Sequence, residues 1–149
     1  MREPVRVEHS VDIARPVERV FAYTSDPEND PAWAGAKSQV RRLSAGPTVV
    51  GSRHRERVSF MGRRIDHSVE VVDLQPNASI TWRDDDGPAP GTIVYGYRAV
   101  GDGTCFTLRL DVELGGALAL AEPLVRRTAD QQVQADLAAL RRVLEGAEP

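Results

Sequence analysis

The sequence predicts an α+β fold in which one antiparallel sheet of seven strands packs against a long C-terminal helix. Three observations lead to this fold class. Near the N-terminus, apolar residues from Val5 to Ile13 alternate with polar ones, which is typical of a half-buried strand. Six more alternating segments follow between residues 38 and 114, separated by Gly, Pro, Asn or Asp. A helical apolar pattern over residues 117–145 comes last.

The composition indicates one globular domain over residues 1–149. The chain is 41% hydrophobic and shows neither an N-terminal signal pattern nor an apolar run that could cross a bilayer. Its 19 basic and 22 acidic residues are interspersed, which excludes the basic stripe of a nucleic-acid-binding protein. Cys105 is the only cysteine, so we expect no intramolecular disulfide and a reducing, cytoplasmic location. The oligomeric state is open, and a homodimer is one option.

The first strand, over residues 5–13, is followed by two short helices. Pro16 opens the first helix, because proline is favoured at helix starts and the apolar residues from 17 to 21 recur at helical spacing. This helix ends near Asp26, and residues 31–33 predict a second short helical turn. The strands after it are expected at 38–44, 49–60, 63–74, 78–84, 92–101 and 104–114.

Met61-Gly62 predicts a two-residue turn that sets the register of the hairpin around it. In this register Glu56 lies directly opposite His67, among apolar pairs on the inner face. The outer face then pairs opposite charges, Arg57 with Asp66 and Arg53 with Glu70. A slip of one residue would mix the two faces, so this register is favoured.

Two other hairpins are predicted in the same way. A turn at Asp102-Gly103 predicts that Ala99 pairs with Phe106, Tyr97 with Leu108, Tyr95 with Leu110 and Ile93 with Val112. A turn at Pro76-Asn77 predicts Val71 opposite Trp82. All three hairpins agree on which face of the sheet points inward.

The C-terminal helix carries a single apolar stripe that must lie on the sheet. Pro123 is expected to kink this helix or to mark where its regular part begins, since proline cannot donate a hydrogen bond to the preceding turn. One stripe is too narrow to cover the concave side of a seven-stranded sheet. Part of the inner face is therefore empty or filled by a ligand. The stripe consists of Leu118, Val125, Val133, Leu137, Leu140 and Leu144.

Four segments of the sequence carry a family resemblance: HSVDIARPVERVFAYTSDPENDPAW, VGSRHRERVSFMGRRIDHSVEVVDLQP, GDGTCFTLRLDVEL and DLAALRRVLEG. They resemble the SRPBCC superfamily, of the polyketide cyclase/dehydrase type related to START and birch-pollen-allergen domains. The resemblance implies a helix-grip fold, in which a seven-stranded antiparallel sheet wraps around the long helix, two short helices close one end and a deep cavity lies between. Relatives include cyclases, dehydratases, lipid and quinone carriers and hormone receptors, so the resemblance does not fix one function.

Glu56 and His67 are the candidate catalytic residues. Directly opposed inward residues have Cβ atoms about 4.5–5.5 Å apart, close enough for a hydrogen bond between carboxylate and imidazole. Such a bond would raise the basicity of His67 and leave its other nitrogen free to accept or deliver a proton. The alternative is a structural pair in which the two side chains only satisfy one another, and the sequence leaves both open.

His54 and His9 extend this polar set as candidate ligand-binding residues. His54 lies one step from Glu56 on the same strand face, and His9 lies on the inner face of the first strand. Three histidines and a glutamate suggest a zinc site, but His9 belongs to the opposite edge of the sheet and no compact ligand motif is present. We therefore expect no metal, and no cofactor.

Aromatic residues are expected to complete the wall of the cavity. Phe60, Trp82, Tyr95 and Tyr97 face inward, and the two phenols could orient a carbonyl of a ligand. Trp33 is expected near the mouth, beside the short helices. Aromatics on an inner sheet face also serve as plain core, so both roles stay open for each of them.

These expectations give two functional hypotheses. One is a protein that binds a small hydrophobic, aromatic or polyketide-like molecule and catalyses its cyclisation or dehydration by acid–base chemistry, a substrate class implied by the resemblance. The other is a non-catalytic carrier or sensor of a lipid, quinone or other hydrophobic ligand. Both need the same cavity, but only the first needs proton transfer.

Overall fold

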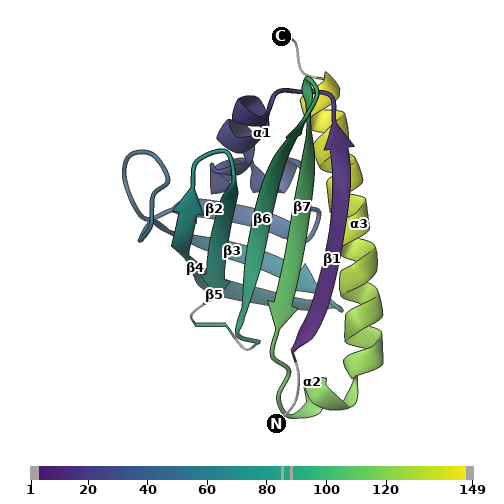
Figure 1. The fold of residues 1–149 in the computed structure, drawn as a ribbon. Coiled ribbons are helices and arrows are strands. Elements are labelled where there is room, and N and C mark those ends of the chain that lie inside the picture. The colour runs from purple at the N-terminus through teal and green to yellow at the C-terminus, as the bar shows by residue number, and fades with distance from the viewer. Residues whose placement is uncertain (1–3, 85, 88, 147–149) are drawn as a thin grey trace.

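The computed structural model describes residues 4–84, 86–87 and 89–146 and contains a seven-stranded antiparallel sheet beside a long helix (Figure 1). The strands lie in the order β1-β7-β6-β5-β4-β3-β2, so that the first strand pairs with the last. Their bounds are β1 Val5–Ile13, β2 Lys37–Arg42, β3 Arg53–Phe60, β4 Arg63–Gln75, β5 Ser79–Asp84, β6 Gly91–Val100 and β7 Gly103–Val112. The predicted α+β helix-grip architecture is confirmed.

Two short helices follow β1, as predicted. They are the α-helix α1, Val17–Thr24, and the 3-10 helix η1, Pro27–Ala32. The strand expected over 49–60 begins only at Arg53, because the chain turns at Gly51, whose φ of 94° lies in the left-handed region that favours glycine.

The C-terminal segment is divided into two helices, α2 over Ala117–Leu120 and α3 over Glu122–Gly146. Pro123 lies in the first turn of α3, where the lack of an N–H costs nothing, so it marks the start of the regular helix. The residues that α3 buries follow the predicted stripe: Val125, Ala129, Val133, Leu137, Leu140 and Leu144. In the part of the chain that the structure describes, no helix has the length and apolar character needed to span a membrane.

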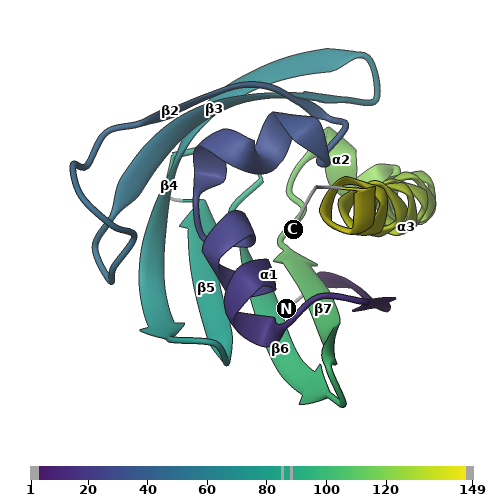
Figure 2. The same cartoon turned by 90° about the horizontal axis from the view of Figure 1, so that it is seen from above.

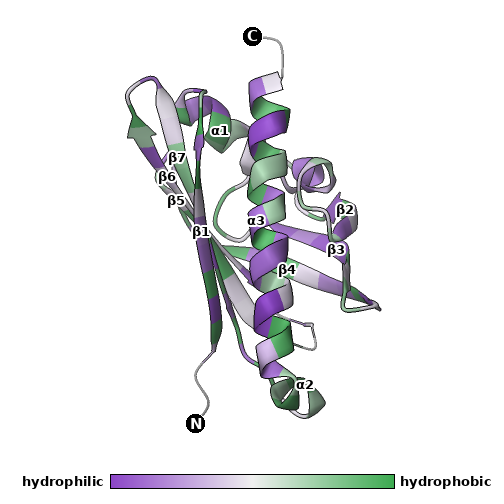
Figure 3. Cartoon of the chain, turned by 90° about the vertical axis from the view of Figure 1, so that its right-hand side faces the viewer, coloured by the Kyte–Doolittle hydropathy of each residue, from purple (hydrophilic) through white to green (hydrophobic). Residues whose placement is uncertain are grey.

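The sheet is strongly curved, and α3 lies across its open side (Figure 2). Seen from the side of α3, the helix lies between the part of the sheet formed by β1, β7 and β6 and the part formed by β2, β3 and β4 (Figure 3). α1 and η1 lie at one end of the space so enclosed (Figures 1 and 2). The core is formed by the apolar stripe of α3 and inward residues of the sheet such as Val71, Ile80 and Phe106.

The β3–β4 hairpin has the predicted register, with Glu56 opposite His67 and His54 opposite Val69. Its turn residues, Met61 and Gly62, both have positive φ, 51° and 79°, as this type of tight turn requires.

The predicted register of β6 and β7 is wrong by two residues. Tyr97 pairs with Phe106, and Tyr95 with Leu108, because the turn lies at Gly101-Asp102. Gly101 has a φ of 59°, which glycine adopts without steric cost. A shift of two residues keeps every side chain on its own face, so the inward set is unchanged. The pairing of Val71 with Trp82 is correct, although an irregularity between Val71 and Asp73 separates this pair from the turn.

Candidate functional site

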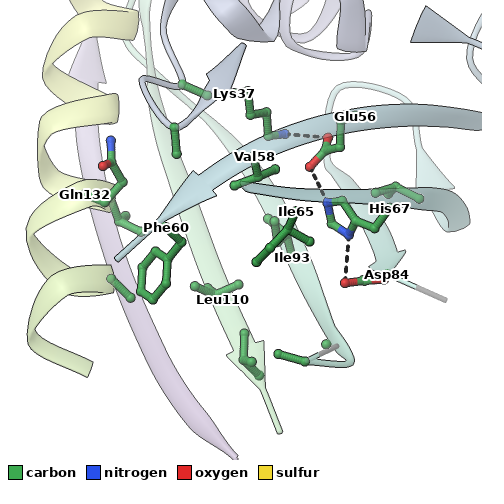
Figure 4. A pocket seen from close by; sticks show the side chains of 18 of the residues that line it. Lys37, Glu56, Val58, Phe60, Ile65, His67, Asp84, Ile93, Leu110 and Gln132 are labelled. Carbon is green, nitrogen blue, oxygen red and sulfur yellow. Dashed lines mark hydrogen bonds and ion pairs between the residues drawn. The ribbon is translucent and has the colours of Figure 1, made fainter. Parts of the chain in front are cut away.

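A cavity of about 840 Å³ lies between the concave face of the sheet and α3. Most of its wall is apolar and includes Val58, Phe60, Ile65, Ile93 and Leu110 (Figure 4). Lys37, Glu56, His67 and Asp84 supply polar groups, and a chain of ion pairs and hydrogen bonds connects them (Figure 4). The interior is therefore an apolar chamber with a polar region on the β2–β5 side.

Glu56 is the centre of this polar region. Its Oε2 lies 2.8 Å from His67 Nε2, across the β3–β4 pair, which confirms the expected contact. Its Oε1 lies 2.9 Å from His54 Nε2 and 3.1 Å from Lys37 Nζ. Burial raises the pKa of Glu56, but the charge of Lys37 and the hydrogen bonds from the two histidines outweigh it and hold the pKa far below its usual value. Glu56 is thus a buried carboxylate.

The second nitrogen of His67 is not free, contrary to expectation. His67 Nδ1 lies 2.8 Å from Asp84 Oδ2 in an ion-pair contact, although its geometry is not that of a hydrogen bond. Asp84 is the last residue of β5, and the sheet places β5 beside β4. Burial lowers the pKa of His67, but Glu56 and Asp84 outweigh this effect and raise it, which favours the imidazolium form.

Lys37 and Asp30 were not predicted as site residues. Lys37 Nζ lies 2.7 Å from Asp30 Oδ2, and both side chains line the cavity. Burial lowers the pKa of Lys37, but the charges of Asp30 and Glu56 raise it well above its usual value, so the ammonium stays charged. One signal was present in the sequence, because Lys37 is the only lysine among the basic residues. Asp30 gave no signal, since η1 brings it to the site by tertiary packing.

Asp136 brings a carboxyl group to the cavity from α3. Its Oδ1 accepts hydrogen bonds from the backbone N–H of Gly35, at 3.0 Å, and from Gln132 Nε2, at 2.7 Å. Burial raises the pKa of Asp136. This group fixes the helix to the connection between η1 and β2 and also faces the chamber.

Tyr95 is the phenol that lines the cavity. Its ring packs among Trp33, Trp82 and Phe106, with centroid distances of 6.0, 5.6 and 5.2 Å. Among the described residues, its hydroxyl has no hydrogen-bond partner, and burial together with the charge of Asp30 raises its pKa well above the usual value. Tyr95 therefore presents a neutral O–H that is available to a ligand.

The structure brings together most of the residues predicted for the site. Those that line the cavity are Trp33, His54, Glu56, Phe60, His67, Trp82 and Tyr95. Their contact with a ligand stays a prediction. Trp33 directly follows η1, beside the short helices as expected, and is buried, with 3% of its surface exposed, against Tyr95.

Two predicted ligand-binding residues, His9 and Tyr97, do not line the cavity. His9 is at a position of β1 whose side chain is on the inward face of the sheet. However, α3 packs beside this edge strand, and His9 Nε2 lies 2.7 Å from Asp130 Oδ1 of that helix. Tyr97 lies further along β6, and its hydroxyl is 2.6 Å from Thr24 Oγ1 of α1. Of the two phenols, only Tyr95 can therefore reach a ligand in the chamber.

The described residues include no group of three or more His, Cys, Asp or Glu side chains that could hold a metal ion. His54 and His67 both face the same carboxylate, Glu56, and His9 lies apart from them on the β1 side.

A family model described as polyketide cyclase/dehydrase and lipid transport matches residues 4–145, nearly the whole chain. The chain belongs to this family. No curated protein is significantly similar to it in sequence. The elements that carry the cavity and its polar region, from β1 to α3, lie within the matched residues of this polyketide cyclase/dehydrase family member, except for Gly146 at the end of α3.

Solved structures with the same fold include proteins of different descriptions. The protein TTHA0849 from Thermus thermophilus has a TM-score of 0.83 at 20% identity, over 96% of this chain and 99% of that chain. A START superfamily protein from Mycobacterium smegmatis has a TM-score of 0.78 at 21% identity, covering 95% and 97%. The Zhui aromatase/cyclase from Streptomyces sp. R1128 has a TM-score of 0.77 at 20% identity, covering 97% and 98%. At these identities the likeness shows the helix-grip fold alone.

Proposed function

We propose that this protein binds a small apolar molecule, ring-containing or polyketide-like, in the cavity between the sheet and α3. The observation that carries this proposal is the chamber itself, since about 840 Å³ bounded mostly by apolar side chains is the size and character of a small-molecule site. The polar groups are a minority of the wall, and Lys37, Glu56, His67 and Asp84 among them are connected on one side, as in sites that orient a ligand. The family description and the aromatase/cyclase of the same fold support the polyketide-like class.

We further propose that the site catalyses a cofactor-free cyclisation or dehydration. His67, protonated between Glu56 and Asp84, is the proton donor, and the Tyr95 hydroxyl is placed to hydrogen-bond a carbonyl oxygen of the ligand. In a dehydration, the proton of His67 would pass to the departing hydroxyl, which leaves as water. The neutral imidazole would then accept the proton lost from carbon. A ligand oxygen must first displace one of the two carboxylates from His67.

The alternative is a non-catalytic carrier or sensor of a lipid, quinone or other hydrophobic ligand. One observation favours it: both ring nitrogens of His67 and both oxygens of Glu56 lie within 3.1 Å of charged or imidazole groups of the protein, so the pair is neutralised without a ligand. A carrier needs the chamber but not the proton transfer.

Turnover and binding separate the two proposals. Native mass spectrometry of protein purified from its source organism would identify a retained small molecule, which then serves as the probe. If His67 is catalytic, Glu56→Gln and His67→Ala abolish turnover of this compound and leave its binding largely intact. His9→Ala, a histidine outside the chamber, is the matched control and changes neither quantity. Equal losses of binding and turnover would favour the carrier.

A further inference from the structure

We propose that the polar region of the cavity accepts a neutral hydroxyl-bearing ring, such as a phenol, and rejects a carboxylate or phosphate. This inference rests on the proposed function, because it assumes that an apolar ligand enters the chamber, and it names the chemistry of the buried end of that ligand. Two features of the cavity wall determine this selectivity: its balance of charge, and the polar atoms there that still lack a hydrogen-bond partner.

Four carboxyl groups lie among the mostly apolar residues of this wall. Asp30, Glu56, Asp84 and Asp136 line the cavity from four different elements, η1, β3, β5 and α3. We refer to these four residues as the acidic wall. An anionic group placed beside them would lose its hydration and gain repulsion, which makes burial of a like charge costly.

The cations beside the acidic wall are already engaged. Lys37 Nζ lies 2.7 Å from Asp30 and 3.1 Å from Glu56, and His67 lies 2.8 Å from both Glu56 and Asp84. The imidazole of His54 is a further partner of Glu56. A ligand carboxylate would have to compete with these protein carboxylates for each cation, and it would leave a buried charge unpaired wherever it succeeded.

The other cations that line the cavity, Arg63 and Arg64, lie at the start of β4, next to the exposed turn residue Met61. Both arginines are solvent-exposed, and neither has an ion-pair partner among the described residues. An anionic substituent of a ligand is therefore accommodated at this hairpin end, where water remains, and not at the acidic wall.

Three polar groups with spare capacity are oxygens that match a hydroxyl group, and the N–H groups of Trp33 and Trp82, also without a hydrogen-bond partner in the described part of the chain, can donate to its oxygen. The Tyr95 O–H is without a partner among described residues and can donate or accept. Asp136 uses one carboxylate oxygen for its two hydrogen bonds, which leaves the other oxygen as an acceptor. Asp30 is only 3% exposed, yet its Oδ1 has no hydrogen-bond partner. A ligand hydroxyl can donate to a carboxylate and accept from a phenol, whereas a ligand carboxylate can only accept.

Calorimetry with three small probes of equal ring size tests this selectivity. The affinity for naphthalene measures how well the apolar chamber binds the ring alone. Naphthol adds a neutral hydroxyl to this ring, and naphthoate adds an anionic group at the same ring position. At neutral pH we expect naphthol to bind at least about tenfold more tightly than naphthoate, and more tightly than naphthalene. The double variant Arg63→Gln, Arg64→Gln is measured in parallel to remove attraction at the hairpin end.

Two variants in the cavity wall and one control outside it show which groups cause the selectivity. Asp136→Asn keeps an oxygen for the N–H of Gly35 but removes a charge, and we expect it to strengthen naphthoate binding about tenfold. Asp130→Asn, on the same helix but outside the chamber, is the matched control and leaves both affinities unchanged. Tyr95→Phe should reduce the affinity for naphthol to that for naphthalene.

The outcomes separate this inference from the proposed function. If naphthoate binds as tightly as naphthol, also in the double arginine variant, the proposed selectivity is wrong, while the proposed binding of apolar ligands in the chamber is retained. If Asp130→Asn changes naphthoate binding as much as Asp136→Asn, the acidic wall is not its cause. If none of the three probes binds, the apolar-ligand function itself fails.

Discussion

Glu56 shows how a buried charge is retained in an otherwise apolar chamber. Removing a carboxylate from water costs several kcal/mol, and only close partners with good geometry offset that cost. Lys37, His54 and His67 provide these partners, at 3.1, 2.9 and 2.8 Å. Lys37 in turn neutralises Asp30, so one ammonium serves two buried carboxylates. At the scale of single residues, Lys37 is therefore the group on which the polar region depends.

Replacement of Lys37 tests this dependence. Lys37→Met leaves Asp30 and Glu56 buried without their common cation, and we expect the free energy of unfolding to fall by about 3–5 kcal/mol. Denaturation in urea measures this change in the free energy of unfolding. Arg57→Met, which breaks an exposed ion pair with Asp66, is the control and should cost no more than about 1 kcal/mol. A similar small loss for Lys37→Met would show that the buried pairs contribute little.

His67 should give the folded protein a pH-dependent stability. Its pKa is higher in the folded state than the usual value of about 6.5, so folding favours the protonated form. The stabilisation by Glu56 and Asp84 is fully present below about pH 6.5 and is lost as the pH rises through the folded pKa.

The measurement is the unfolding free energy of the protein minus that of His67→Gln, followed from about pH 6 to about pH 9. The difference should decrease steadily with pH. The same difference for His9→Gln, a half-buried histidine that faces Asp130 outside the chamber, serves as the reference. A His67 difference that is constant or increases with pH would contradict the imidazolium assignment.

At the scale of elements, the β3–β4 hairpin positions the candidate catalytic pair. Alternation decides which side chains face inward, and the two-residue turn decides that Glu56 meets His67. The β6–β7 hairpin shows the limit of this reasoning, because Gly101-Asp102 and Asp102-Gly103 are both acceptable turns. Only the pairing of β7 with β1 and β6 together selects one register.

The turn residues themselves offer a test at this scale. Met61 holds a φ of 51°, a conformation that asparagine tolerates better than methionine, so Met61→Asn should stabilise the fold by about 0.5–1 kcal/mol. Asn77, in the β4–β5 turn, has a φ of 62°, and Asn77→Ala should lower the stability by a similar amount. Thermal unfolding of both variants measures the two effects. Destabilisation by Met61→Asn would mean that the Met61 side chain, which also lines the cavity, contributes more than the turn strain.

At the scale of the whole molecule, one helix stands opposite a sheet that is too wide for it to cover. α3 fills part of the concave space with Leu137, Leu140 and Leu144, and α1 and η1 close one end. The apolar side chains that line the remaining chamber have no protein atoms packed against them on the chamber side. A ligand that fills it should stabilise the fold in proportion to its affinity and concentration.

Filling the chamber by mutation should separate binding from folding. Val58 lines the cavity, so Val58→Trp is expected to abolish the binding of an apolar fluorescent dye while the chain still unfolds cooperatively. Leu140 is fully buried but is not part of the cavity wall. Leu140→Ala should therefore lower the unfolding free energy by about 2–5 kcal/mol and leave dye binding intact. Undiminished dye binding to Val58→Trp would place the ligand elsewhere.

Much of this protein can be predicted from its sequence, because the governing rules are local. Alternation with a period of two assigned Glu56, His67 and Tyr95 to the inner face of the sheet, and a helical period assigned Leu137 and Leu140 to the core. Turn residues at Met61-Gly62 then placed Glu56 against His67. Each of these results depends on neighbours within a few residues or across one hairpin.

The tertiary structure alone decided the rest. The curvature of the sheet and the packing of η1 over β2 bring Asp30 to Lys37, and Lys37 to Glu56, contacts that no sequence spacing specifies. The position of α3 beside β1 removes His9 from the chamber by pairing it with Asp130. The alignment of β5 with β4 occupies the second nitrogen of His67. The alternation along a strand determines on which face of the sheet each side chain lies. The closing of the sheet around its helix determines which of the inward side chains contact one another.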